Sequence, residues 1–304
     1  EVRARTDFKP IAKDIEANYS LSEKEPEGAE GNVESFVRYF NNRLERLRKI
    51  ICDRGPGLGM VQDINSIKKM SDGKELSVVG IVRGKHITKN KNMLVEIEDE
   101  SGKVPAIFIN SMNKQMRELY ADASSLVNDE VVALSGKRSG DLLIANKILW
   151  PDVPIKNVKN TEDDIAIAFI SDIHMGSRLF MEKSFNKMIS WLNGNVEDER
   201  EIAGKVKYIV IAGDDVDGIG VYPGQERDLA VLDVYAQYRM LFDYLEMIPD
   251  YIQIFLLPGN HDAVQRAEPQ PRIPDELADF KMENVHLLSS PAMIKMHDIE
   301  VLAY

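Results

Sequence analysis

Short apolar runs and longer stretches of helical periodicity alternate through the second half of the chain. The apolar runs predict buried strands, and the stretches between them predict helices. The predicted strands are Ile165–Ile170, Tyr208–Ala212 and Tyr251–Leu257, and the predicted helices are Glu182–Leu192 and Asp228–Met247. This order is typical of an α/β fold, a mostly parallel sheet with helices on its faces. We assign it to residues 160–304, after an extended segment at Pro151–Lys159.

Apolar and polar residues alternate with a period of two in the segment before Pro151. Strands are predicted at Glu75–Thr88, Lys91–Asp99, Lys103–Asn110, Glu130–Gly136 and Asp141–Leu149, with a helix at Asn113–Tyr120 after the third. Three strands, a helix and two strands is the order of an OB-type β-barrel, which we place at residues 73–152. Phe108 is the clear aromatic residue on these strands. The pattern therefore leaves both single-strand binding and protein docking open for the barrel.

An amphipathic helix is predicted ahead of the barrel. Apolar residues recur at helical spacing over Val33–Ile51, and Asn32 stands where a capping residue is expected. The segment 20–31 is rich in Glu, Ser and Gly, which predicts a linker, and Gly55–Gly59 breaks the chain after the helix. We therefore interpret residues 1–60 as an N-terminal arm, this helix and a linker.

Composition narrows the class of protein. The chain has 304 residues, 44% of them hydrophobic, which is enough for two packed cores and excludes a disordered chain. No segment approaches the roughly 18 apolar residues of a membrane span. The single cysteine, Cys52, cannot form an internal disulfide, so we expect a cytoplasmic setting. A net charge of -12 argues against a broad basic surface for nucleic acid, although bound divalent cations would reverse the local charge.

A polar cluster follows each predicted strand of the α/β region. The clusters are Asp172-Ile173-His174, Gly213-Asp214-Asp215-Val216-Asp217 and Gly259-Asn260-His261-Asp262. In an open α/β sheet, ligands bind beyond the carboxyl ends of the strands, so we expect the three loops to converge on one crevice. One such cluster alone is common in turns and helix caps. Three of them, each after an apolar strand, predict a metal site.

The donor types in these clusters indicate the chemistry. Asp172 and His174 lie one residue apart on an extended segment and point to the same side. Asp214 is suited to bridge two ions, and Asn260 offers a neutral carbonyl oxygen. Mixed oxygen and imidazole donors favour two divalent ions, Mn²⁺ first, with Fe, Zn or Mg as alternatives. Such a pair catalyses in-line phosphoryl displacement, in which we assign Asp214 and His261 as the catalytic residues, His261 protonating the leaving oxygen.

Further residues are candidates for supporting roles. We expect Asp217 to orient the loop around Asp214, and Asp262 to orient His261. A stretch rich in Pro and Arg follows the third cluster and is suited to line a substrate path. The candidate contacts to substrate phosphates are Arg178, Arg266 and Arg272.

The motifs D-x-H, GD-x-x-D and GNH-D resemble those of the calcineurin-like metallophosphoesterase superfamily, over Asp163 to the end of the chain. An OB barrel joined to such a domain is similar to the layout of the small, or B, subunits of replicative DNA polymerases. Eukaryotic members have lost the metal ligands, whereas residues 170–177 and 257–263 here resemble the archaeal D-family small subunits. The resemblance implies a proofreading 3′–5′ exonuclease. It also implies a large catalytic subunit, the single-stranded primer 3′ end and, through the assembly, a sliding clamp as partners.

One departure from the superfamily pattern concerns its later histidines, one after a fourth strand and others in a G-H-x-H pair. Here Ile299–Tyr304 is the candidate fourth strand, and neither His286 nor His297 has the required context. We therefore expect a truncated domain whose natural chain continues past Tyr304. Two alternatives remain open: a catalytically silent scaffold that docks the large subunit, and a general metallophosphatase.

Overall fold

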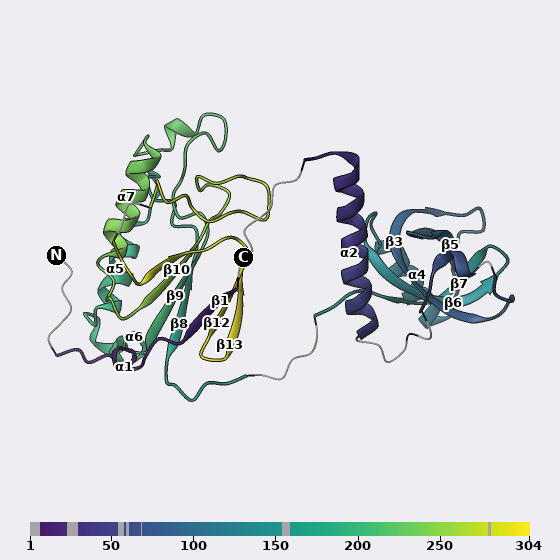
Figure 1. Ribbon diagram of the computed structural model, residues 1–304, viewed down its shortest axis with the longest axis horizontal. Coiled ribbons are helices and arrows are strands. Elements are labelled where there is room, and N and C mark those ends of the chain that lie inside the picture. Colours follow the sequence, from purple (N-terminus) through teal and green to yellow (C-terminus); the bar gives the residue numbers. More distant parts are fainter. Residues whose placement is uncertain are drawn as a thin grey trace. The chain divides into compact units, whose positions relative to one another are not determined.

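The computed structural model describes residues 7–22, 30–53, 58, 61–67, 69–153, 159–278 and 281–304. Most of the predicted break at Gly55–Gly59, and residues 154–158 and 23–29 of the predicted linkers, lie outside this part. The chain splits into two compact units, Ala29–Asn157 and a second unit that combines Glu1–Gly28 with Val158–Tyr304 (Figure 1). Among the described residues, no helix has the length and apolar character needed to cross a membrane.

A closed β-barrel forms the centre of the first unit. Its elements are β2 (Val61–Gln62), α3 (Ile64–Ile67), β3 (Glu75–Ile87), β4 (Met93–Asp99), β5 (Gly102–Phe108), α4 (Lys114–Ser125), β6 (Val131–Ser139) and β7 (Leu142–Leu149). The strands pair in the order β3-β4-β5-β7-β6, and β6 returns to β3 and closes the barrel. Helix α4 follows Asn113, whose side chain accepts hydrogen bonds from two main-chain N–H groups of the first turn. The OB-type barrel predicted from the sequence is confirmed.

Alternate strand residues fill the barrel, as the period of two predicts. Val95, Ile97, Val104 and Ala106 are buried in its core, and Phe108 is completely buried. The one clear aromatic of the barrel strands therefore belongs to the core and is not available to stack on a base.

Helix α2 (Val33–Asp53) packs on the outside of the barrel through its C-terminal half. Leu44 and Ile51 are buried against β3 and β6. The predicted cap is present, because the side chain of Asn32 accepts a 2.8 Å hydrogen bond from the N–H of Ser35. In the N-terminal half of α2, Val33, Phe36, Val37 and Tyr39 are exposed.

The second unit contains the predicted parallel sheet. Its elements are β8 (Ala166–Ile170), α5 (Glu182–Leu192), the 3₁₀ turn Glu197–Glu199, α6 (Arg200–Ala203), β9 (Val206–Ala212), the 3₁₀ turn Gln225–Arg227, α7 (Val234–Leu245), β10 (Gln253–Leu257) and β11 (Val285–Leu287). All three strand pairs are parallel, in the order β11-β10-β9-β8. The prediction that the last helix begins at Asp228 is wrong, because Asp233 caps α7 by accepting from the N–H groups of Tyr235 and Ala236.

A second, antiparallel sheet lies beside the parallel one. It consists of β1 (Tyr19–Ser22), β12 (Ala292–Met296) and β13 (Ile299–Ala303), in the order β1-β12-β13, and the short helix α1 (Ile11–Asp14) precedes it. The interpretation of 20–31 as a linker is therefore wrong for its first three residues. The fourth parallel strand is β11, so Ile299–Ala303 forms a strand as predicted but belongs to the other sheet. The strand β1 was not predicted because it is mostly exposed and carries two serines, so its sequence lacks the pattern of a buried strand.

Successive residues of β9 face two different cores. Ile209 and Ile211 pack beneath the helices, whereas Tyr208 and Val210 pack against the antiparallel sheet. Figure 1 shows α5 and α7 on one side of the parallel sheet and β1, β12 and β13 on the other. Because both faces are buried, the strand sequences are uninterrupted apolar runs. The loops at the carboxyl ends of the strands are left to carry the polar clusters.

Candidate metal centre

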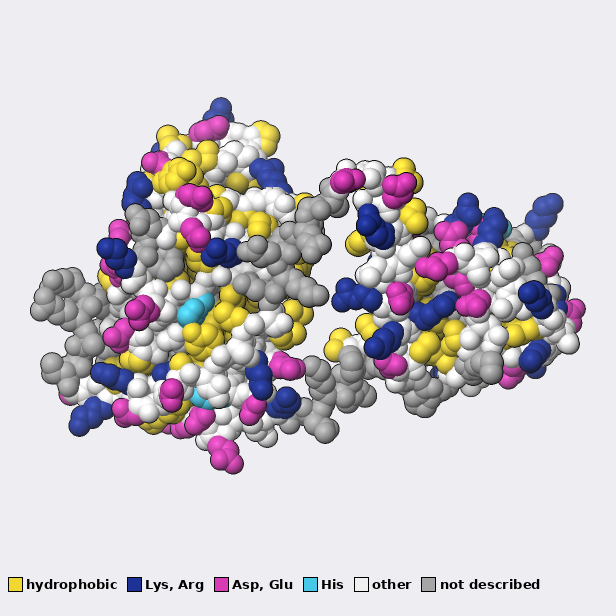
Figure 2. All heavy atoms as spheres, viewed as in Figure 1, with side chains coloured by type: hydrophobic (Ala, Val, Ile, Leu, Met, Phe, Trp, Pro, Cys, Tyr) yellow, Lys and Arg dark blue, Asp and Glu magenta, His cyan; other side chains and the backbone are white. Residues whose placement is uncertain are grey.

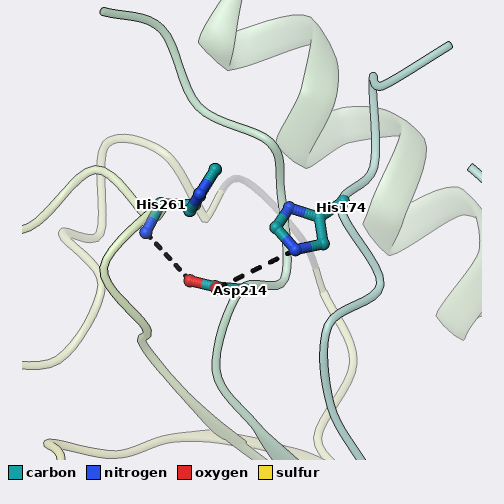
Figure 3. Close-up of side chains that lie close together, drawn as sticks. All are labelled: His174, Asp214 and His261. Carbon is teal, nitrogen blue, oxygen red and sulfur yellow. Dashed lines mark hydrogen bonds and ion pairs between the residues drawn. The ribbon is translucent and has the colours of Figure 1, made fainter. Parts of the chain in front are cut away.

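The three predicted clusters meet beyond the carboxyl ends of β8, β9 and β10. His174, Asp214 and His261 each offer one ligand atom, and these atoms lie within 4.8 Å of one another. Figure 3 shows Asp214 between the two histidines, with an interaction to each. The convergence expected from the strand order is therefore confirmed for these three residues.

The backbone of the first two loops is held in an uncommon conformation. Asp172, His174 and Asp214 have φ values of 56°, 49° and 54°, in the left-handed region that non-glycine residues rarely adopt. The prediction that Asp172 and His174 lie on an extended segment is therefore wrong. Hydrogen bonds between the loops hold it, since the N–H of Asp172 donates to the carbonyl of Gly213 and that of His174 to the carbonyl of Asp214. Such positions cluster at functional sites, where the surrounding structure maintains them.

Two glycines allow the second and third loops to touch. A Cβ at Gly259 would lie 2.3 Å from Oδ1 of Asp214 and 2.4 Å from its main-chain nitrogen. A Cβ at Gly213, where φ is +87°, would lie 2.9 Å from Cα of Gly259. The glycines of the GD and GNH motifs are thus required by this close approach.

Asp217 holds both imidazole rings. Its Oδ1 lies 3.3 Å from Nδ1 of His174 and 3.2 Å from Nδ1 of His261, and its main-chain oxygen lies 2.9 Å from the latter. Because these oxygens only accept, each Nδ1 carries the proton and each Nε2 faces away from Asp217. Nε2 of His174 lies 3.9 Å from carboxylate oxygens of Asp172 and Asp214. A carboxylate on the far nitrogen of a histidine is typical of metal ligands.

Asp262 connects the loops, whereas the sequence predicted that it orients His261. Its carboxylate accepts hydrogen bonds from the N–H groups of Asp215 and Gly259 and from the hydroxyl of Tyr238. Burial raises the pKa of Asp262 to about 6, although these hydrogen bonds act in the opposite direction.

The centre has more negative charge than its described partners neutralise. Asp215 is completely buried, and neither of its carboxylate oxygens, nor Oδ2 of Asp217, has a hydrogen-bond partner among the described residues. Burial, followed by the nearby carboxylates of Asp262 and Asp214, raises the pKa of Asp215 well above its usual range. The donor set that fits divalent transition metals is the carboxylate of Asp214 beside the two oriented imidazoles, within this acidic surrounding.

Asn260 and Arg266 lie around a second, smaller cavity. It measures about 230 Å³, and His261 also lines it. The side chain of Asn260 is exposed there, and Nη2 of Arg266 donates a 2.8 Å hydrogen bond to the carbonyl of Gly220. Asn260 and Arg266 therefore share this cavity with His261.

The other two arginines have protein partners. Nε of Arg178 donates to the carbonyl of Arg227, and Arg272 forms an ion pair with Asp275. Figure 2 shows basic and acidic side chains interspersed over the described surface of the face it draws. Substrate contact by the arginines therefore stays a prediction.

Two histidines of the second unit have structural contacts. Nε2 of His286 lies 3.0 Å from the hydroxyl of Tyr19 and 2.9 Å from Oε1 of Gln253, and burial lowers its pKa. Nδ1 of His297 lies 2.7 Å from a carboxylate oxygen of Asp163. Both lie outside the metal centre.

A larger cavity opens beside the metal centre, and the sequence patterns did not predict its other wall. It measures about 670 Å³, and its lining includes Asp172, His174, Asp217 and His261 together with apolar side chains from the start of α5. Tyr222 also lines it, with its ring centroid 6.3 Å from that of His261. The available signal was the glycine-rich segment that contains Tyr222, directly after the second cluster.

Two similar solved structures each match part of the chain. The telomere capping protein Ten1 from Saccharomyces pombe matches with a TM-score of 0.21 and 20% identity, over 29% of this chain and 76% of that one. Asparaginyl-tRNA synthetase from Pyrococcus horikoshii matches with a TM-score of 0.22 and 19% identity. The match covers 25% of this chain and 19% of the synthetase chain. The OB-type barrel is identified from the pairing of its strands, without the help of these matches.

Known sequences match more extensively. Residues 165–297 match the calcineurin-like phosphoesterase family. The DNA polymerase II small subunits of Methanocaldococcus jannaschii and Archaeoglobus fulgidus are both 39% identical, over 98% and 100% of this chain and 50% and 58% of theirs. That of Pyrococcus furiosus is 40% identical over 92% of this chain and 46% of its own. The chain spans about half the length of these curated relatives. It is similar to DNA polymerase II small subunits over nearly all of its own length, and residues 165–297 match the calcineurin-like phosphoesterase family.

Proposed function

We propose that this chain carries a metal-dependent 3′–5′ exonuclease that proofreads for a separate large polymerase subunit. The observation that carries the proposal is the cluster of His174, Asp214 and His261, whose ligand atoms lie within 4.8 Å of one another beside an open cavity. The name shared by the relatives, "DNA polymerase II small subunit", supports DNA as the substrate and a large subunit as the partner. We expect contact with a sliding clamp through that assembly.

Asp172, His174, Asp214 and Asn260 are the residues we assign to hold two divalent ions, Mn²⁺ first. When bound, the metals supply Lewis-acid stabilisation of the phosphoryl charge and a nucleophilic water at neutral pH. Asp217 keeps His174 turned so that Nε2 is free to bind. Asp214 holds the third loop by accepting a hydrogen bond from the N–H of His261.

His261 is the residue we assign to protonate the leaving oxygen. Its Nδ1 donates to the main-chain oxygen of Asp217 and lies 3.2 Å from Oδ1 of that residue. A carboxylate beside Nδ1 stabilises the doubly protonated ring, and this leaves the Nε2 proton to be transferred. In this proposal Asp217 contributes to the reaction by orienting both histidines, His174 for metal binding and His261 for proton transfer.

The test uses the full-length protein with Mn²⁺ and a single-stranded oligonucleotide labelled at its 5′ end. We expect His261→Ala and Asp214→Ala to slow removal of 3′ nucleotides by about a hundredfold or more. The exposed residues His86 and Asp243 provide matched controls, and His86→Ala and Asp243→Ala keep the parent rate. Parent rates in both site variants would refute the assignment.

A docking role for the same chain is favoured by α2. Phe36, Val37 and Tyr39 are more than half exposed on its N-terminal half, which suits a protein interface. If the full-length protein binds the large subunit but no metal-dependent hydrolysis of DNA is detected, the chain is a silent scaffold. Faster hydrolysis of a chromogenic phosphomonoester than of DNA would instead identify a general phosphatase.

We place the protein in the cytoplasm, where the exposed thiol of Cys52 stays free.

A further inference from the structure

The larger cavity has two chemically different walls. One wall is the polar group Asp172, His174, Asp217 and His261, which the proposed function uses. The other wall is apolar and comes from the segment that enters α5, and the proposed chemistry gives it no role. Its residues are Leu179, Phe180, Met181, Phe185 and Met188. We define Leu179, Phe180 and Met181 as the apolar shelf.

The shelf is anchored, yet two of its side chains face solvent. The ring of Phe180 makes edge contacts with Phe185 and Tyr244, each at a centroid distance of 5.8 Å. On either side of this anchored residue, Leu179 is 84% exposed and Met181 is 70% exposed. Large apolar side chains gain free energy when a ligand covers them, and here they lie beside a reaction centre.

Tyr222 adds an aromatic ring to the same cavity. Its hydroxyl donates a 3.0 Å hydrogen bond to Asp228, and the ring lies 6.3 Å from the imidazole of His261. The residue is 40% exposed, and its side chain lines the cavity. An aromatic face held in place beside a phosphodiesterase site is suited to stack on a base of any sequence.

The acidic lining of this cavity does not provide the basic side chains that usually bind the phosphates of a polynucleotide. Its lining includes Asp172, Asp217 and Asp228, and among the described lining residues there is no Lys or Arg. Contacts to phosphate therefore depend on bound cations, and selectivity for the end of a strand has to come from the base. A cavity of about 670 Å³ lies within the size range of small-molecule sites and is large enough for a terminal nucleotide.

We propose that the apolar shelf and Tyr222 form a subsite for the unpaired base of the 3′-terminal nucleotide. This inference rests on the proposed exonuclease, whose substrate it specifies as a frayed or single-stranded end. A base within a duplex is stacked and paired on its neighbours, so it reaches the subsite only after unpairing, as other enzymes that act on bases require. The subsite thus favours a mismatched end over a matched one.

The experiment measures binding without hydrolysis. The probe is a single-stranded oligonucleotide with 2-aminopurine at its 3′ end and phosphorothioate linkages that resist cleavage, titrated with the full-length protein and Mn²⁺. We expect the fluorescence of the base to fall on binding to the parent. Leu179→Ala/Met181→Ala is expected to raise the Kd about tenfold, and Tyr222→Ala to raise it to a similar extent.

Controls separate the base from the backbone. Ile202→Ala/Leu302→Ala removes two apolar side chains of the same unit that are also more than half exposed, and it keeps the parent Kd. An oligonucleotide with an abasic 3′ residue binds the parent about tenfold more weakly, and the shelf variant does not weaken it further. Equal Kd values for intact and abasic probes, or for parent and shelf variant, overturn the subsite.

The two proposals fail in different ways. Quenching that depends on the shelf, with no cleavage of an unmodified strand, supports the subsite and refutes the exonuclease. Equally fast Mn²⁺-dependent cleavage of intact and abasic 3′ ends supports the exonuclease and refutes the subsite. Because Leu179 and Met181 are exposed, their replacement leaves the core intact, which thermal unfolding of the variant verifies.

Discussion

The main-chain N–H of His261 donates a 2.9 Å hydrogen bond to Oδ1 of Asp214, while Oδ2 of the same carboxylate lies 3.9 Å from Nε2 of His174. One side chain therefore connects the loops that follow β8, β9 and β10. We expect the position of the third loop to depend on an acceptor at residue 214, and the proposed metal binding to depend on the charge of the carboxylate.

Asp214→Asn and Asp214→Ala separate these two contributions. Asn keeps an acceptor for the N–H of His261, so we expect near-parent stability but Mn²⁺ binding at least about tenfold weaker by calorimetry. Ala also leaves that N–H without its partner, and we expect a further loss of about 1–3 kcal/mol in the free energy of unfolding by urea. Equal stability of the two metal-free variants would contradict this division.

Asp217→Asn tests whether the buried carboxylate orients both imidazoles. The neutral amide accepts only weakly from Nδ1 of His174 and of His261, and we expect the affinity for Mn²⁺ to fall about 10–100-fold. Because Asp217 also lies 3.2 Å from Nδ1 of His261, we expect the rate of DNA hydrolysis to fall together with the affinity for Mn²⁺. Asp243→Asn, on the exposed face of α7, is the matched control. Parent affinity in Asp217→Asn would show that the rings are held by other contacts.

Gly259→Ala tests the close approach of the second and third loops. The new Cβ would meet both the side chain and the backbone of Asp214, so we expect a loss of about 1–3 kcal/mol in stability and of Mn²⁺ binding. At Gly102 a Cβ meets nothing within 4 Å, and Gly102→Ala should leave both quantities unchanged. Unimpaired metal binding by Gly259→Ala would mean that the loops separate without consequence.

His286→Asn tests a pH effect outside the metal centre. Burial lowers the pKa of His286 below its ordinary 6.5, so near this pH the unfolded chain binds more protons than the folded one. The contribution of His286 to stability therefore falls as pH drops below about 6.5. It is measured as the difference between parent and variant in urea unfolding between about pH 7.5 and 5.5, because the buried carboxyls of Asp215 and Asp262 titrate identically in both. The variant should lose less stability over this interval, and the exposed His86→Asn should lose as much as the parent. Identical slopes in parent and His286→Asn would contradict the effect.

Local patterns were sufficient for most of the fold. The barrel strands alternate with a period of two, and the strands of the parallel sheet are continuous apolar runs because both of their faces are buried. The start of α7 was misplaced, since the segment before Asp233 contains helix-compatible residues and the cap decides where the helix begins. The meeting of His174, Asp214 and His261 followed from the rule that ligands bind beyond the carboxyl ends of parallel strands.

The sequence by itself determined the fold classes of the two units and the kinds of side chain available to bind a metal, because strand periodicity and donor chemistry are local properties. Only the tertiary structure decided that Tyr19–Ser22 pairs with β12, that Asp217 holds two imidazoles, and that a shelf beside Leu179 adjoins the metal centre. Each of these depends on atoms that are distant in the chain. Their contact energies arise only after the sheet has brought its loops together, so no spacing in the sequence records them.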